Sequence, residues 1–430
     1  MQENHASSLR GLAQVITASF VFAFAAMNPS AYAQAGNYHV IYKFTGTSSS
    51  GFTPDSSGNF YGVDQSGKYG TVYELTPSGG GWKRNVIFAF PGGAGGYSPS
   101  GALIFDHSGN LYGTTASGGT YGGGTVYELS PSSSGGWTQE ILYAFTGGSD
   151  GETPEQGVIF DSAGNLYGTT FEGGIESGVV FELSPPVSGT AWNQTVLHTF
   201  NYSTDGAYPN GGLAFDSTGN LYGTASSGGD TSCGVGAVGD GCGVVFEFTP
   251  SSSGWNYNVI FTFNGTDGAS PIGQLTFDSS GNLYGVTAVG GVISKCYSDG
   301  CGVVYKLSLI SGVWNETLLH VFQPGTGNDA YGPGGGTPQG GISFDGPGTL
   351  YGVAAYGGAN GYGVVYKLLR ESSGAWKEAV VYNFAGGAEG YTPLEPLTLT
   401  TAGDLLGTTY QGGNSGCHGL SCGVLYEIKP

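Results

Sequence analysis

Basic residues are scarce in this chain. It contains only 11 lysine and arginine residues against 31 aspartate and glutamate residues, so its formal net charge is −20. Proteins that bind the phosphate backbone need clustered basic side chains, which argues against a nucleic-acid partner. The same deficit disfavours docking on anionic membrane surfaces. We interpret the acidic surface as a solvating one, with the capture of cations such as calcium as the alternative.

Motifs of several catalytic chemistries are also absent. The six histidines show no metal-ligand spacing, and no Gly-x-Ser-x-Gly nucleophile elbow occurs. His198 and His320 fall at one position of an aromatic-rich segment in two repeats, so we interpret them as packing residues. The sequence therefore predicts no catalytic residue, no metal site and no cofactor, with calcium alone left open.

Long apolar runs are missing except at the N-terminus. There, Arg10 precedes an apolar stretch from Leu12 to Met27, and Ala31-Tyr32-Ala33 forms an A-x-A cleavage pattern. Residues 1–33 are therefore predicted to be a signal peptide, with an uncleaved membrane anchor as the alternative. No second apolar span occurs, so we expect residues 34–430 to be exported, extracellular or periplasmic, and monomeric.

The chain contains few cysteines, six in all, and their number is even. An even count after a signal peptide predicts disulfides rather than free thiols. A zinc site is disfavoured because the spacing is wrong and histidine ligands are missing. The six cysteines form three close pairs, each before the same strand of its repeat: Cys233/Cys242, Cys296/Cys301 and Cys417/Cys422.

Glycine, in contrast, is abundant, with 84 residues, and it recurs at fixed places in a repeated segment. One copy of the segment runs from Phe105 to Gly113 and reads FDHSGNLYG. A period of this size indicates supersecondary units that bury their apolar faces only against neighbours. We interpret the first acid of each copy as a turn residue that accepts backbone N–H groups. The seven copies start at Asp55, Asp106, Asp161, Asp216, Asp278, Asp345 and, altered, Thr400.

Each repeat contains four strand-like segments rich in β-branched and aromatic residues. In the second repeat they are Leu103–Phe105, Asn110–Thr115, Gly124–Leu129 and Trp137–Phe145. Four antiparallel strands in each of seven units, without helical periodicity, predict an all-β protein: a single seven-bladed β-propeller over residues 34–430.

The two ends of the chain complement each other in this prediction. The last repeat stops after its third strand, whereas the segment Tyr38–Phe44 resembles a fourth strand without a repeat. Pairing the two would close the propeller and remove an exposed sheet edge. The first repeat departs from the pattern, because Gly51–Asp55 is too short for a full first strand.

The loops that vary between repeats lie on one face of the predicted propeller, and such loops commonly carry binding sites. An Asp-Gly motif recurs before the first strand of several units. The acids most simply fix turn geometry, and the alternative is a ring of oxygen ligands for calcium or sugar hydroxyls. Nearby tyrosines could stack on sugar rings. The candidate ligand-binding residues are Asp150, Asp205, Tyr208, Asp267, Asp329, Tyr331, Glu389 and Tyr391.

The pattern Phe-Asp-Ser-x-Gly-Asn-Leu-Tyr-Gly, followed by Gly-Val-Val-Tyr-Glu-Leu-Ser-Pro and Trp, resembles the "GloVer" tandem repeat of bacterial exported proteins, also called choice-of-anchor proteins. The resemblance covers residues 38–430 and implies export and a propeller-like fold, without a particular activity. The chain departs from it in lacking a C-terminal sorting anchor. It is also similar to kelch repeats, but the copper site of kelch-type oxidases does not carry over because no suitable histidine pair exists.

Three functions are compatible with these features. The first is a secreted, non-enzymatic module that binds a carbohydrate or a protein on the variable-loop face. The second is an extracellular carbohydrate-active enzyme, a lyase or glycosidase, that uses a pair of loop carboxylates. The third is a structural component of an envelope or matrix. The sequence favours the first.

Overall fold

The structure is a computed structural model. It describes residues 37–46, 51–79, 81–175, 177–189, 191–233, 235, 241–293, 296, 299–326, 331–346, 348–413 and 422–429. All of these residues belong to one compact unit, Gln34–Pro430. The predicted signal peptide, residues 1–33, lies outside the described residues.

The described residues form seven repeat units of four antiparallel strands, which we number along the chain. Unit 1 comprises β2 (Thr53–Pro54), β3 (Phe60–Asp64), β4 (Thr71–Ser78) and β5 (Gly81–Ala89). Unit 2 comprises β6 (Tyr97–Phe105), β7 (Leu111–Ser117), β8 (Thr125–Pro131) and β9 (Trp137–Ala144). Unit 3 comprises β10 (Ile159–Phe160), β11 (Leu166–Thr170), β12 (Val179–Ser184) and β13 (Asn193–Thr199).

Unit 4 comprises β14 (Ala214–Phe215), β15 (Leu221–Ala225), β16 (Val244–Ser251) and β17 (Gly254–Thr262). Unit 5 comprises β18 (Ala269–Phe277), β19 (Leu283–Val289), β20 (Val303–Ile310) and β21 (Val313–Val321). Unit 6 comprises β22 (Gly336–Phe344), β23 (Thr349–Tyr356), β24 (Val364–Arg370) and β25 (Trp376–Asn383). A single parallel pair, Gln274 with Gly341, joins units 5 and 6 into one eight-stranded sheet.

Unit 7 combines the two ends of the described chain. Its strands β26 (Thr398–Leu399), β27 (Leu405–Thr408) and β28 (Val424–Lys429) are followed in the sheet by β1 (Asn37–Lys43). The antiparallel register runs from Asn37 opposite Lys429 to Lys43 opposite Val424. This is the pairing that the sequence predicts.

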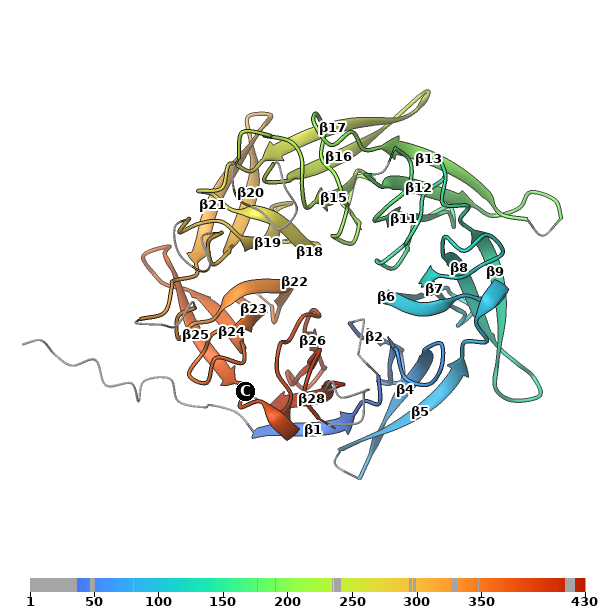
Figure 1. The fold of residues 1–430 in the computed structure, drawn as a ribbon, viewed down its shortest axis with the longest axis horizontal. Helices are drawn as coiled ribbons and strands as arrows, with labels where there is room; N and C mark the ends of the chain where they lie inside the picture. The colour runs from blue at the N-terminus through green and yellow to red at the C-terminus, as the bar shows by residue number, and fades with distance from the viewer. Residues whose placement is uncertain are drawn as a thin grey trace, which may run out of the picture. The chain divides into compact units, whose positions relative to one another are not determined.

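The sheets follow one another around a common centre, with the first strand of each unit innermost and the fourth outermost (Figure 1). In the described ranges, two short 3₁₀ helices, η2 (Gly93–Gly95) and η3 (Gly387–Glu389), lie in connecting loops. No helix of the described residues is long and apolar enough to cross a membrane. The sequence predicts that the first repeat lacks a full inner strand, and β2 indeed has only two residues. The first repeat is not exceptional, however, because β10, β14 and β26 also have two residues.

The apolar core lies between neighbouring units rather than inside any one of them. One cluster contains Tyr112 and Phe145 of unit 2 together with Leu166 and Phe181 of unit 3. A single four-stranded sheet exposes both of its faces, so each unit needs its neighbours to bury this surface. This packing explains why the repeat must occur in tandem.

The repeated aspartate is a turn residue, as the sequence predicts. Asp106 Oδ1 accepts hydrogen bonds from the backbone N–H groups of Ser108 (2.8 Å) and Asn110 (2.9 Å). Asp106 Oδ2 accepts one from the Asn110 side chain (2.8 Å). These three bonds close the turn between the first two strands of the unit. They recur at Asp55, Asp161, Asp216 and Asp278.

Candidate functional site

The acid of the loop between β9 and β10 is engaged in local hydrogen bonds. The Asp150 carboxylate accepts from the backbone N–H of Thr146 (2.9 Å) and from the hydroxyl of Tyr143 (2.9 Å), which lies on β9. Partial burial opposes ionisation, but the hydrogen bonds from Thr146 and Tyr143 outweigh it and lower the pKa of Asp150. The carboxylate therefore already has the partners that a ligand would need to displace.

The backbone of the same loop is held from the other side. Gln194, on the outermost strand of the next unit, donates from Nε2 to the carbonyl oxygen of Asp150 (3.2 Å). The loop thus bridges the outermost strands of units 2 and 3. We call this arrangement an inter-unit clasp: the acid side chain bonds to the preceding unit, and the acid carbonyl bonds to the following one.

Glu389 forms the same clasp, whereas Asp205 forms its carbonyl half and a close contact with the preceding unit. Asp205 lies 3.2 Å from His198 Nε2 of unit 3, and its carbonyl accepts from the Tyr257 hydroxyl of unit 4 (2.7 Å). Glu389 accepts from the Tyr382 hydroxyl of unit 6 (2.8 Å), and its carbonyl accepts from the Tyr38 hydroxyl of unit 7.

Asp267 does not form a complete clasp. Asp267 accepts from the backbone N–H of Asn264 (2.8 Å), and burial raises its pKa. Asp329 lies outside the described residues. No group of three or more His, Cys, Asp or Glu side chains in the described ranges is arranged to hold a metal ion. Each described loop acid thus accepts hydrogen bonds from its own local partners, and the ring of oxygen ligands stays an alternative prediction.

The candidate tyrosines pack against other aromatic rings of the loops. Tyr208 stacks on Phe171, with ring centroids 5.1 Å apart. Tyr331 stacks on Tyr356 (5.4 Å). Tyr391 lies 5.4 Å from Tyr362 in a tilted arrangement. One face of Tyr208 and one face of Tyr331 are therefore already covered.

Two of the three expected disulfides are confirmed. Cys233 is bonded to Cys242 and Cys296 to Cys301, with Cα–Cα distances of 5.7 and 5.3 Å. Each bond closes a loop between the second and third strands of its unit. These two disulfides therefore lie where the sequence predicts them.

The third expected disulfide, between Cys417 and Cys422, is not confirmed in the same way. Cys417 lies outside the described residues. Cys422 is described: its side chain is fully buried in an apolar cluster with Phe44 and Phe52, and its backbone N–H donates to the carbonyl of Gly412 (3.1 Å). The structure thus places Cys422 in the core between units 7 and 1, and its pairing with Cys417 stays a prediction.

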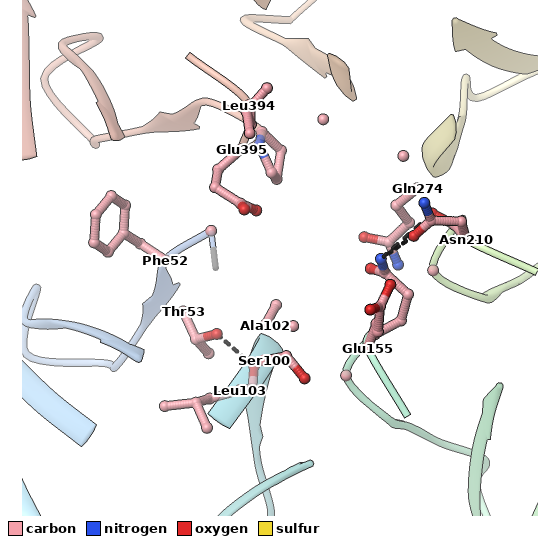
Figure 2. A pocket seen from close by; sticks show the side chains of 18 of the residues that line it. Phe52, Thr53, Ser100, Ala102, Leu103, Glu155, Asn210, Gln274, Leu394 and Glu395 are labelled. Atoms are coloured by element: carbon pink, nitrogen blue, oxygen red, sulfur yellow. Dashed lines mark hydrogen bonds between the residues drawn. The ribbon is translucent and has the colours of Figure 1, made fainter. Parts of the chain in front are cut away.

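A hollow among the described residues lies where the innermost strands begin. It is a cavity of about 710 Å³, within the usual size range of ligand sites. Figure 2 shows its lining side chains, which come from different units and converge on one space. Many of these residues directly follow the proline that ends each Asp-Gly loop, as Glu155 follows Pro154 and Asn210 follows Pro209. The cavity therefore lies beside the loop face that the sequence favours, but it uses different residues.

Amide side chains form much of the polar lining. Gln156 Nε2 donates to Asn210 Oδ1 (3.2 Å), and Gln274 Nε2 donates to the carbonyl oxygen of Leu213 (2.9 Å). These bonds between neighbouring units use the amide nitrogens as donors. An amide oxygen, such as that of Gln274, is a hydrogen-bond acceptor with two lone pairs, so the lining can accept hydrogen bonds from a ligand.

Two carboxyl groups, Glu155 and Glu395, lie in the same cavity, on opposite sides in Figure 2. Burial raises the pKa of Glu395 to about 7. Burial, with a smaller contribution from Glu172, also raises the pKa of Glu155. No lysine, arginine or histidine lines the cavity in the described part of the chain. The cavity thus presents acceptors and acids without a compensating cation.

Sequence reasoning missed these residues for an identifiable reason. It followed the acids that recur before the proline, and recurrence there reflects the shared clasp geometry. The residues after the proline differ from unit to unit, for example Glu155, Asn210, Gln339 and Leu394. This variation at one position of an otherwise regular repeat is the signal that could have identified the cavity.

The repeats of this chain match the model of a known protein family. The family model described as "Gloeobacter/Verrucomicrobia repeat" matches residues 27–237 and, in an overlapping match, residues 139–336. A comparison with curated proteins found no match.

Solved structures share only a distant similarity with the chain. A glucose dehydrogenase is 15% identical, with 92% of this chain and 99% of that chain covered and a TM-score of 0.45. A luciferin-regenerating enzyme is 16% identical, with 92% and 96% covered and a TM-score of 0.45. A protein of unknown function from Dyadobacter fermentans DSM 18053 is 10% identical, with 91% and 96% covered and a TM-score of 0.45. These similarities carry no argument about activity.

Proposed function

Because the chain belongs to the Gloeobacter/Verrucomicrobia repeat family, we propose that it is an exported binding module. In this proposal residues 1–33 are a cleaved signal peptide, and the seven units are the blades of a β-propeller closed by the pairing of β1 with β28. The two disulfides support an oxidising, extracytoplasmic location. The ligand occupies the central cavity rather than the loop acids.

The acceptor-rich lining of the cavity carries the proposal. Amide oxygens and two carboxyl groups accept hydrogen bonds, so the cavity favours a ligand rich in donors. Sugar hydroxyls and protonated amines have this character. The absence of basic side chains from the described lining disfavours phosphates and carboxylates as ligands. We therefore propose an oligosaccharide, neutral or amine-bearing, as the ligand class.

Calorimetric titration with two matched oligosaccharides tests this function. A cello-oligosaccharide and a chitosan oligosaccharide of equal length differ only in a hydroxyl or an ammonium group at each C2. Gln274→Ala should weaken the binding of both by about tenfold, the effect of losing about 1.4 kcal/mol. Glu395→Gln should weaken chitosan binding more than cello-oligosaccharide binding, because it removes the negative charge.

The matched control is Gln323→Ala, which makes the same truncation at an exposed residue away from the cavity. This variant should bind like the unaltered protein. Failure of both oligosaccharides to bind, or equal binding by the cavity variants and the control, would contradict the proposal.

A second candidate function is hydrolysis of a glycosidic bond. It is favoured by the presence of two carboxyl groups in one cavity, one of them with a pKa raised by burial to about 7, which suits a general acid. Release of reducing ends from the same oligosaccharides measures this activity. Glu155→Gln and Glu395→Gln should each abolish it, and turnover that survives both substitutions would exclude this function.

A further inference from the structure

Four outermost strands of the described chain donate a side-chain hydrogen bond to the loop that leads into their own unit. Gln194 and Tyr257 donate to the carbonyls of Asp150 and Asp205, as described above. Gln139 Nε2 of unit 2 donates to the carbonyl of Gly95 (3.0 Å). Tyr38 of unit 7 is the fourth donor. Three of these bonds form the carbonyl half of the clasp, and the Gln139 bond reaches the corresponding loop of unit 2. Each bond requires a donor.

The donor position is defined by its distance from the tryptophan of the outermost strand. Gln139, Gln194 and Tyr257 each lie two residues after a tryptophan. In units 5 and 6 the residues two positions after Trp314 and Trp376 are Glu316 and Glu378. An ionised carboxylate is only an acceptor, whereas a protonated carboxyl carries one O–H donor. Unit 1 is different, because its residue Arg84 pairs with Asp64 of its own unit.

Glu316 lies in surroundings that disfavour its charge. Its Oε1 atom is buried and has no hydrogen-bond partner among the described residues. The negative charge of Asp267, in the loop that leads into unit 5, acts on it, and the buried Tyr305 ring is a further neighbour. The ion pairs found in the described ranges include no lysine or arginine bound to Glu316.

Glu378 is placed in the same way against the loop that leads into unit 6. A side-chain carbon added at Gly334 would lie 2.5 Å from Glu378 Oε2, so the carboxyl is packed against this loop. Its Oε1 atom is buried and has no partner in the described part of the chain. The titratable groups that face it are Tyr366 and His320, with His320 Nε2 3.5 Å from Oε2.

We propose that Glu316 and Glu378 act in their protonated form as the missing clasp donors of units 5 and 6. The attachment of these two units to the preceding loops is then sensitive to pH and weakens as the pH rises. The other donors, glutamine amides and tyrosine hydroxyls, do not titrate in the same range. The described chain thereby contains two junctions whose donors titrate, among junctions whose donors do not.

The pKa values of Glu316 and Glu378 are both raised, in agreement with a role in the protonated form. Burial, reinforced by Asp267, raises the pKa of Glu316 to about 8, and burial raises that of Glu378 to about 7, from an ordinary value of 4.5. Burial lowers the pKa of His320 to about 4, so this imidazole is neutral above that pH and does not keep Glu378 ionised. Since both folded-state values exceed the unfolded value, the stability that these groups contribute is complete below about pH 4.5. It is lost as the pH rises toward 7 and 8.

The experiment compares the full chain with the double variant Glu316→Gln/Glu378→Gln, in which both donors are permanent. Melting temperatures measured by scanning calorimetry from pH 5 to pH 9 should nearly coincide at pH 5. At pH 8.5 the double variant should melt several degrees higher than the unaltered protein. Equal dependence of the two melting temperatures on pH, or a variant that is less stable at every pH, would overturn the proposal.

The chain offers a reciprocal variant at an equivalent position. Gln194→Glu replaces a permanent donor in unit 3 by a titratable one, so its melting temperature should fall more steeply with pH than that of the unaltered protein. If this variant does not fold, infrared spectra of the unaltered protein provide the second measurement. A protonated carboxyl band that persists at pH 6 and decreases in the double variant supports the proposal, and its absence contradicts it.

Discussion

Tyr127→Phe should stabilise this protein, although it removes a hydroxyl group from β8, the third strand of unit 2. The Tyr127 side chain is fully buried. Its hydroxyl has no hydrogen-bond partner among the described residues. It lies against the backbone of the neighbouring strand, where a side-chain carbon at Gly113 would be only 2.6 Å from the hydroxyl oxygen. Phe181 and Phe246 occupy the equivalent places in units 3 and 4, over Gly168 and Gly223.

Two opposing contributions set the size of the effect. A buried hydroxyl without a partner costs about 1–3 kcal/mol, and the substitution removes this cost. The lost oxygen leaves a void of roughly 15 Å³, which at about 24 cal/mol per Å³ costs about 0.4 kcal/mol. The free energy of unfolding should therefore increase by about 0.6–2.6 kcal/mol.

The matched control is Tyr112→Phe in the same unit. The Tyr112 hydroxyl donates to Asp106 Oδ2 (3.3 Å), so its removal should lower the free energy of unfolding by about 0.5–1.5 kcal/mol. Scanning calorimetry or chemical denaturation of both variants should thus give shifts of opposite sign. A clear loss of stability in Tyr127→Phe would refute the reasoning, since it would show that the hydroxyl has a partner, such as a buried water molecule.

Three further predictions concern other junctions. Gly124→Ala should lower the free energy of unfolding by about 2–3 kcal/mol in thermal denaturation, because the residue has φ of 96° and the added carbon would lie 2.5 Å from a strand carbonyl; unchanged stability would contradict this. Reduction of the Cys233–Cys242 bond, which closes a short loop, should destabilise the protein by about 2–3 kcal/mol, measured as a lower melting temperature after thiol treatment. Asp64→Ala should cost about 3–5 kcal/mol, because it leaves Arg84 buried without its ion-pair partner, and Asp64→Ala with Arg84→Met should recover part of this loss in a double-mutant cycle.

The architecture could be predicted from the sequence because it is encoded locally and repeatedly. Each Asp-x-x-Gly-Asn turn is closed by hydrogen bonds within five residues, as between Asp106 and Asn110, and such bonds depend little on distant parts of the chain. Seven copies made the strand order and the need for neighbours evident. The pairing of β1 with β28 followed from a strand missing at one end and an extra strand at the other.

The function of each acid could not be predicted, because it depends on contacts between units. Asp150 resembles a ligand-binding residue in the sequence, yet Tyr143 on one side and Gln194 on the other hold its loop in a clasp. Glu395 stands out in no motif, yet the convergence of inner strands places it in the cavity and raises its pKa to about 7 through burial.

The sequence by itself thus determined the repeat, its turns and its strands, since short-range hydrogen bonds and the alternation of side chains specify them. Only the tertiary structure decided which polar groups line the cavity and which are held in clasps. That outcome depends on burial and on partners some 50 residues away in the chain, as for Gln156 and Asn210, whose separation is 54. No local pattern records such partners.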